Sequence, residues 1–133
     1  MRFTKITIIS SRKPRESDIN EQLQWFGGSL GLFGNRDKDK SCFRIFIVLI
    51  RNLKEEGPIT SDEIALRTGL TRGTVVHHLN SLMSAGIVTS EKEGYQLKVD
   101  NLENLVDIIK GNVDRAFDNL KEIGRELDGK LGL

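Results

Sequence analysis

Residues 60–86 read TSDEIALRTGLTRGTVVHHLNSLMSAG, and this stretch decides the fold. Thr60 and Glu63 have the spacing of a capping box, in which the hydroxyl accepts a backbone N–H three residues on and the carboxylate reaches back. Gly69 can adopt a positive φ at little cost, so the chain can turn sharply there. Thr71 is a good N-cap for a following helix. The stretch therefore predicts two short helices joined by a tight turn.

The second predicted helix has two unlike faces. One is an apolar stripe at helical spacing, made of Val75, Leu79, Leu82 and Met83. The other is a modestly polar surface that carries Arg72, Gly73, Val76, His77, Asn80 and Ser84. Gly86 ends this helix. Residues 87–89 and 95–99 then predict the two strands of a hairpin, with a turn at 90–94 that places Lys92 between two glutamates.

The string TRGTVVHHLNSLMSAGIV, residues 71–88, resembles the recognition-helix segment of ArsR-like and MarR-like winged helix-turn-helix transcriptional regulators, a prokaryotic family with archaeal members. Ala65, Gly69 and Val75 match the small, turn and β-branched positions of the helix-turn-helix pattern. The resemblance covers roughly residues 41–99 and implies a winged helix that binds DNA. His78 departs from the general pattern, which has an apolar residue there, but the ArsR-like version tolerates it. The Cys pairs or His and carboxylate sets of metal-sensing members are missing, so metal sensing is not implied.

Upstream of this stretch, residues 42–53 (CFRIFIVLIRNL) predict a helix that is apolar on most sides and therefore buried on more than one. We expect it to be the central first helix of the winged-helix core, with Ser41 as its cap. Gly57 and Pro58 end it. Ile59 then predicts a minimal first strand.

The first 40 residues predict an extension to that core. Residues 2–9 predict a short strand, and residues 17–26 a helix capped by Ser17 or Asp18 and ended by Gly27 and Gly28. Residues 36–40 form a charged linker. Four apolar side chains are expected to dock on the winged helix or on a second subunit: Trp25, Phe26, Leu32 and Phe33.

Residues 10–16 (SSRKPRE) are a basic loop, and two interpretations of it are open. Arg12, Lys13 and Arg15 can reach a phosphate backbone as a flexible arm, or they can belong to an ordinary solvated loop.

The last segment carries a second strong pattern. Eight apolar residues alternate in spacing between four and three, which is a heptad seam. They are Leu102, Val106, Ile109, Val113, Ala116, Leu120, Ile123 and Leu127. A helix of this length projects beyond a small domain. Pairing with a second copy is therefore the favoured interpretation, and folding back onto the chain's own N-terminal helix is the alternative.

Composition limits the function classes. The net charge is +1, with +3 in residues 1–40, +1 in residues 41–99 and −3 in residues 100–133, so tight nonspecific binding to nucleic acid is not expected. The single Cys42 excludes a disulfide framework and favours a cytoplasmic location. No stretch is apolar enough to span a membrane. His77 and His78 are adjacent, so they cannot ligate a metal as an i, i+4 pair. We find no catalytic constellation and expect neither an enzyme, a cofactor nor a metal site.

The sequence thus predicts a mainly α fold with a small β-hairpin (α+β). Its parts are an extension (1–40), a winged helix-turn-helix DNA-binding domain (41–99) and a dimerisation helix (100–133). We expect a homodimer that binds double-stranded DNA, with two recognition helices in major grooves about 34 Å apart. The expected DNA contacts are Thr71, Arg72, Gly73, Thr74, Val76, His77, Asn80 and Lys92. The alternative is a winged-helix protein–protein interaction module or adaptor of the transcription machinery. Nothing in the sequence names an effector.

Overall fold

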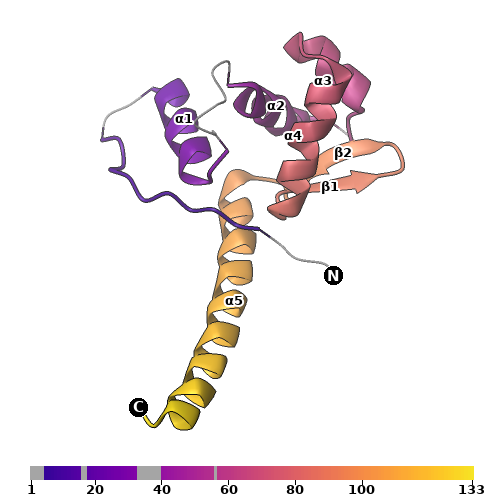
Figure 1. The fold of residues 1–133 in the computed structure, drawn as a ribbon. Helices are drawn as coiled ribbons and strands as arrows, with labels where there is room; N and C mark the ends of the chain where they lie inside the picture. Colours follow the sequence, from indigo (N-terminus) through magenta and orange to yellow (C-terminus); the bar gives the residue numbers. More distant parts are fainter. Residues whose placement is uncertain (1–4, 16–17, 33–39, 56) are drawn as a thin grey trace.

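The computed structural model describes residues 5–15, 18–32, 40–55 and 57–133. Its elements are α1 (Ile19–Ser29), α2 (Ser41–Arg51), the 3-10 turn η1 (Asn52–Lys54), α3 (Ser61–Thr68), α4 (Arg72–Ser84), β1 (Val88–Glu91), β2 (Gly94–Leu97) and α5 (Leu102–Leu131). Figure 1 shows α1 to α4 and the hairpin gathered into one body, from which α5 projects as a long arm. The predicted winged helix, mainly α with one antiparallel hairpin, is confirmed.

The core of this body is built around α2, as its apolar composition predicts. Ile45 and Phe46 are fully buried, and Leu49 is nearly so. The predicted stripe of α4 packs into the same cluster through Val75, Leu79 and Leu82. Ser41 is the first residue of α2 and is buried, so it is not the N-cap that we predicted; Lys40 occupies that place with a left-handed backbone.

The helix–turn–helix forms as its capping residues predict. The Thr60 hydroxyl accepts the N–H of Glu63 at 3.1 Å, and the Thr71 hydroxyl accepts the N–H of Thr74 at 3.2 Å. Gly69 ends α3 with a φ of 71°. The carboxylate of Glu63 contacts Arg67 at 3.0 Å, one helical turn on, which is a different partner from the Thr60 N–H of the predicted capping box.

The hairpin is shifted relative to the predicted strands. β1 and β2 pair in antiparallel register with Glu91 opposite Gly94, so the connection is a two-residue turn, tighter than the turn at 90–94 that we expected. Ile59 is the predicted minimal strand: its N–H and carbonyl exchange hydrogen bonds of 2.9 and 2.8 Å with Tyr95. Gly94 has a φ of 142°, and a Cβ there would lie 2.4 Å from the Ile59 carbonyl oxygen. This close approach requires glycine.

The N-terminal helix begins two residues later and ends three residues later than the predicted span of 17–26. Asp18 caps it by accepting the N–H of Glu21 at 2.8 Å, and the helix continues through Gly27 and Gly28 to Ser29. The chain turns away from the helix at Gly31, which has a φ of 71°. Glycine remains helical where its backbone makes helical hydrogen bonds and no left-handed conformation is required. Gly27 and Gly28 therefore do not end the helix.

Two of the four apolar side chains that we expected to dock do contact the winged-helix core. The ring of Phe26 stacks on Phe46 with centroids 6.3 Å apart, and Leu32 is buried in the core. Trp25 is half-buried. Phe33 and most of the charged linker lie outside the described residues.

The predicted N-terminal strand is wrong over its described part, residues 5–9. This segment is extended, but its hydrogen bonds go to helix ends. The Lys5 N–H donates to the Ser84 carbonyl at 2.9 Å, and the Ile9 N–H donates to the Ser29 carbonyl at 2.8 Å. The segment therefore crosses from the end of α1 to the end of α4 (Figure 1). Residues 2–4 lie outside the described part.

Helix α5 begins after Asn101, which caps it: the Asn101 side chain accepts the N–H of Asn104 at 2.8 Å. Its 30 residues end at Leu131, with Gly132 as the C-cap, so the whole helix is about 45 Å long. The first turns belong to the core, because Leu105 and Ile109 are buried there. The helix projects away from α1, so the arrangement in which it folds back onto the N-terminal helix is not observed (Figure 1). Within the described chain, no helix is long and apolar enough to span a membrane.

Candidate DNA-binding interface

The candidate reading surface is the outer face of α4. Because Val75, Leu79 and Leu82 face the core, the residues half a turn away must face solvent. Arg72, Gly73, His77 and Asn80 are all exposed, as predicted, whereas Val76 is half-buried. A rigid apolar side thus fixes the orientation of the polar side.

The threonines at the start of α4 have a structural role as well. The Thr71 hydroxyl donates to the Thr74 hydroxyl at 2.9 Å while it caps the helix. Thr71 is exposed and Thr74 half-buried, so both still border the reading surface. A phosphate at this helix end would also meet unpaired backbone N–H groups and the positive end of the helix dipole.

Arg72 has a partner within the helix-turn-helix. Its Nε lies 3.4 Å from the carboxylate of Asp62 on α3, and both side chains are more than two-thirds exposed. Exposed ion pairs of this kind contribute little to stability and are weakened by salt. Arg72 can therefore leave Asp62 for a base edge or phosphate at small cost.

Lys92 is exposed in the turn of the hairpin, between Glu91 and Glu93. That turn lies to the side of α4, as a wing (Figure 1). Lys92 therefore lies apart from the predicted contacts on α4. Only a ligand broad enough to touch the helix and the wing together can contact both.

Two features near this surface were missed by the sequence analysis. Ser81, one turn after His77, is exposed on the outer face, and its hydroxyl donates to the His77 carbonyl at 3.4 Å. The helical period itself would have found it. The hydrogen bond from the Lys5 N–H to the Ser84 carbonyl brings Lys5 to the end of α4, and no local pattern signals that contact.

The two histidines do not form a metal site. Their ring centroids lie 5.4 Å apart at an angle of 62°, with His77 exposed and His78 half-buried, as expected for adjacent residues on a helix. Among the described residues, no group of three His, Cys, Asp or Glu side chains is placed to hold a metal ion.

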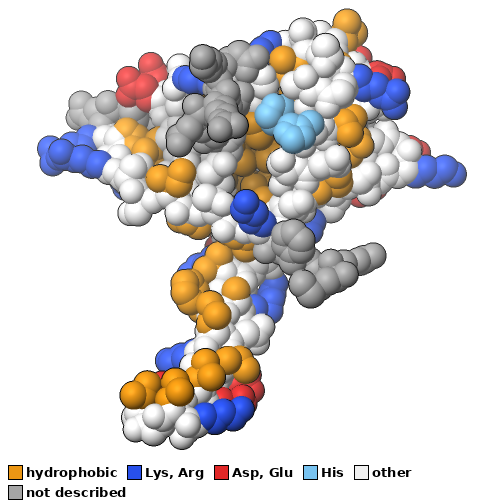
Figure 2. Space-filling model, viewed as in Figure 1, with side chains coloured by type: hydrophobic (Ala, Val, Ile, Leu, Met, Phe, Trp, Pro, Cys, Tyr) orange, Lys and Arg blue, Asp and Glu red, His pale blue; other side chains and the backbone are white. Residues whose placement is uncertain are grey.

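The face of the molecule that carries the histidines is not uniformly basic. In Figure 2, the Lys and Arg side chains stand at separate places around the pale-blue histidines, with no continuous patch. This distribution agrees with a net charge of +1. Binding here must depend on a few well-placed contacts more than on total charge.

The distal part of α5 is a second candidate surface. Five large apolar side chains lie exposed along it: Phe117, Leu120, Ile123, Leu127 and Leu131. Figure 2 shows this hydrophobic row continuing to the end of the arm. On the polar side, a hydrogen bond to Asp114 and the charge of that carboxylate raise the pKa of Lys110. Of the predicted seam, Ile109 is buried in the domain, whereas Ala116, Leu120, Ile123 and Leu127 are exposed.

A cavity of about 510 Å³ lies between η1, the wing and the start of α5. Apolar Leu53 and Ile108 line it together with polar Gln96. None of the predicted DNA contacts lines it.

The comparisons with known proteins agree with this geometry. Residues 48–89, which run from α2 into β1, match the family model of winged helix-turn-helix DNA-binding domains. No curated protein and no solved structure gives a significant match. The matched span includes the capped turn at Gly69 and the whole of α4. The chain therefore has a winged helix-turn-helix fold, and over residues 48–89 it is similar to DNA-binding domains of this kind.

Proposed function

We propose that this protein is a dimeric, sequence-specific transcriptional regulator of the ArsR-like and MarR-like type that acts in the cytoplasm, with α4 in the major groove of double-stranded DNA. The observation that carries the proposal is the exposed polar face of α4, held by a buried apolar face inside a matched DNA-binding domain. Winged helices present this helix to base edges while flanking groups position the protein on the backbone.

Each predicted contact has a chemical role in this proposal. Arg72 suits guanine and Asn80 suits adenine, because each can make a bidentate contact to that base. Val76 offers an apolar surface to a thymine methyl group. The space above Gly73 is open, so the backbone can approach DNA closely there. The phosphate contacts are Thr71, Thr74 and Lys92. His77 lies between the base contacts and the phosphate contacts.

The proposed dimer rests on the exposed row of α5. An apolar face of this length is unusual on a monomer. We divide the chain into an extension (1–40), the DNA-binding domain (41–99) and a dimerisation helix (100–133). A two-fold dimer would place two copies of α4 at half-sites separated by one DNA turn or a multiple of it.

The reading face can be tested by truncating its two specific side chains. Arg72→Ala and Asn80→Ala should each weaken binding to a selected site by about 1–3 kcal/mol, because each would remove a base contact. The fold should be unaffected, since both side chains are exposed. Fluorescence anisotropy measures the affinity, and Arg125→Ala on distal α5 is the matched control. If both variants bind as tightly as the parent, this face does not read DNA.

The basic loop can be tested by removing its charge. Changing Arg12, Lys13 and Arg15 to Gln together should weaken binding equally on all sequences and flatten its dependence on salt, because phosphate contacts release counterions. All three residues are exposed, so no core contact is lost. Replacing the two arginines with lysine keeps the charge and should keep the slope. An unchanged slope in the Gln variant would show that this is only a solvated loop.

The alternative function is a protein–protein interaction module or adaptor of the transcription machinery. The scattered cations and a wing with one lysine between two glutamates favour it. An adaptor would bind no duplex with sequence preference, so DNA selection separates the two.

A further inference from the structure

We propose that two copies of this chain pair antiparallel through residues 116–131 of α5, so that the end of each helix lies beside the partner's winged domain. The inference rests on the dimer of the proposed function and specifies its geometry. Two independent observations carry it: the place of the domain on α5, and the residues that flank the seam.

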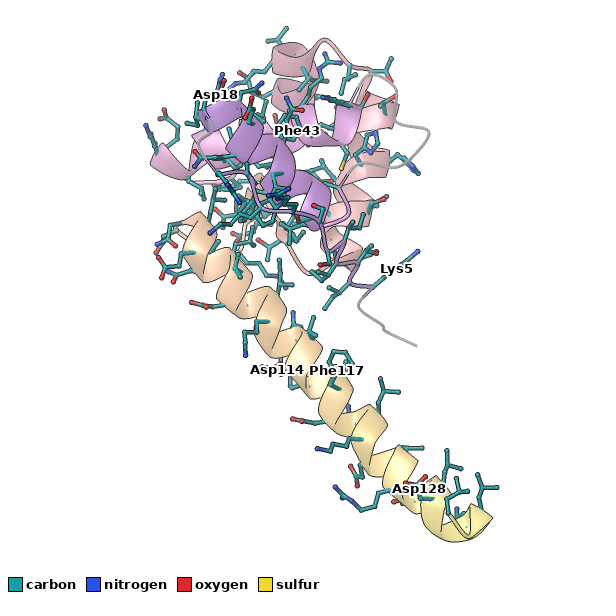
Figure 3. The ribbon with its side chains drawn as sticks, turned by 90° about the vertical axis from the view of Figure 1, so that its left-hand side faces the viewer. Lys5, Asp18, Phe43, Asp114, Phe117 and Asp128 are labelled. Atoms are coloured by element: carbon teal, nitrogen blue, oxygen red, sulfur yellow. The ribbon has the colours of Figure 1, made fainter. Side chains whose placement is uncertain are left out.

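The winged domain and the exposed seam lie on the same side of α5. Ile109 is buried in the domain, and Leu120 follows it by 11 residues, which is within about 20° of three full turns at 3.6 residues per turn. In Figure 3, Phe117 lies on the side of the helix that the domain overhangs, and Asp114 on the other. The apolar row that enters the core in the first turns therefore continues, uncovered, along the rest of the helix.

This continuity favours one direction of pairing. In a parallel pair, the partner's α5 would lie along the distal seam and continue toward the start of its own helix. That continuation would enter the space that the winged domain of the first copy occupies. In an antiparallel pair, the partner chain ends at Leu133, beside the winged domain of the first copy. The partner's own winged domain then lies beyond the C-terminal end of the first copy's α5. Straight helices can thus use the whole distal seam only in the antiparallel arrangement.

The residues beside the seam give the second argument. One flank carries Phe117, Gly124 and Leu131 at seven-residue spacing, and the other carries Asn112, Asn119 and Glu126. Flanking positions set the orientation of a coiled coil. In an antiparallel pair, each flank meets the same flank of the partner, so apolar meets apolar. In a parallel pair, Phe117 and Leu131, which are 64% and 68% exposed, would face polar residues.

These flanks also fix the centre of the pair. With Gly124 opposite the partner's Gly124, Phe117 lies beside the partner's Leu131. No atom lies within 4 Å of a Cβ built on Gly124, so the helices can approach closely there. The two Leu105 positions, where the domains attach, are then about 57 Å apart along the helices at 1.5 Å per residue. This exceeds one DNA turn of about 34 Å, so we expect the two half-sites to be two turns apart.

Spin-label distances test the direction without touching the seam. Labels are attached to Asp114→Cys or Lys121→Cys, both on the exposed polar side, in a Cys42→Ala background that removes the one native thiol. In the antiparallel pair, the axial separation between copies is about 30 Å for position 114 and about 9 Å for position 121. We expect the measured distance at 114 to exceed that at 121 by at least about 10 Å. Equal distances would show parallel pairing and overturn the inference.

Sedimentation of the same samples separates this inference from the proposed function. A dimer with equal distances leaves the dimer of the proposed function standing, whereas a monomer overturns both. A pair of opposite charges placed at the contact gives a second test. Phe117→Lys and Leu131→Glu should each weaken the dimerisation affinity at least tenfold, and the double variant should recover most of that loss. These positions are four turns apart within one helix, so only contact between antiparallel copies can restore the pair. Absence of recovery would contradict the proposed contact.

Discussion

Replacing Leu120 with glutamate is expected to convert the proposed dimer into a monomer of about 15 kDa while the winged domain stays folded. Leu120 is 67% exposed in the single chain, so the substitution removes little intrachain packing. In the paired state, the new carboxylate would be buried without a partner, at a cost of several kcal/mol per copy. DNA affinity should fall with the dimer, because a single half-site supplies fewer contacts. Val113→Glu is a poorer test, since Val113 also packs against the core.

Sedimentation at micromolar concentration measures this result, and thermal melting checks the fold. Lys121→Glu, on the exposed polar side of the same helix, is the control and should remain a dimer. A dimeric Leu120→Glu protein would show that the distal row of α5 is not the interface.

Replacing Leu105 with alanine should produce the second large effect, on the stability of the domain itself. Leu105 is completely buried although it lies outside the 48–89 span that matches the family. Loss of a buried leucine side chain costs about 2–5 kcal/mol through lost transfer energy and a residual cavity. Urea denaturation should therefore show a lower midpoint, at protein concentrations that keep parent and variant in the same oligomeric state.

Leu133→Ala is the control for that measurement, because Leu133 is 87% exposed at the end of the chain. It should leave the urea midpoint unchanged. An equally small effect of Leu105→Ala would mean that the start of α5 does not belong to the cooperative core.

The sequence predicted those parts of the fold whose signals are local. The caps at Thr60 and Thr71 and the left-handed turn at Gly69 each depend on residues within one helical turn, and all three are confirmed. The apolar stripe of α4 is also a local pattern, and it determines which face of the helix is exposed. The polar reading face follows from it by geometry alone.

What the sequence missed depends on tertiary partners. Residues 5–9 have the composition of a strand, but composition does not name a partner, and the chain bonds to the ends of α1 and α4. The seam of α5 is one continuous pattern, yet only the fold shows that Ile109 is covered by the chain's own domain and Leu120 is not. The DNA contacts of Arg72 and Asn80 stay predictions, which the alanine variants of these two residues test.

Sequence-specific DNA binding is tested by selecting duplexes from a random pool. The selected site and a shuffled one are then titrated by fluorescence anisotropy at several salt concentrations. We predict enrichment of a two-fold symmetric site, bound at least about a thousandfold more tightly than the shuffled duplex, as specific DNA-binding proteins do. Affinity should fall steeply with salt. A pool that yields no common site, with equally weak binding to all duplexes, would contradict sequence-specific regulation and favour the adaptor.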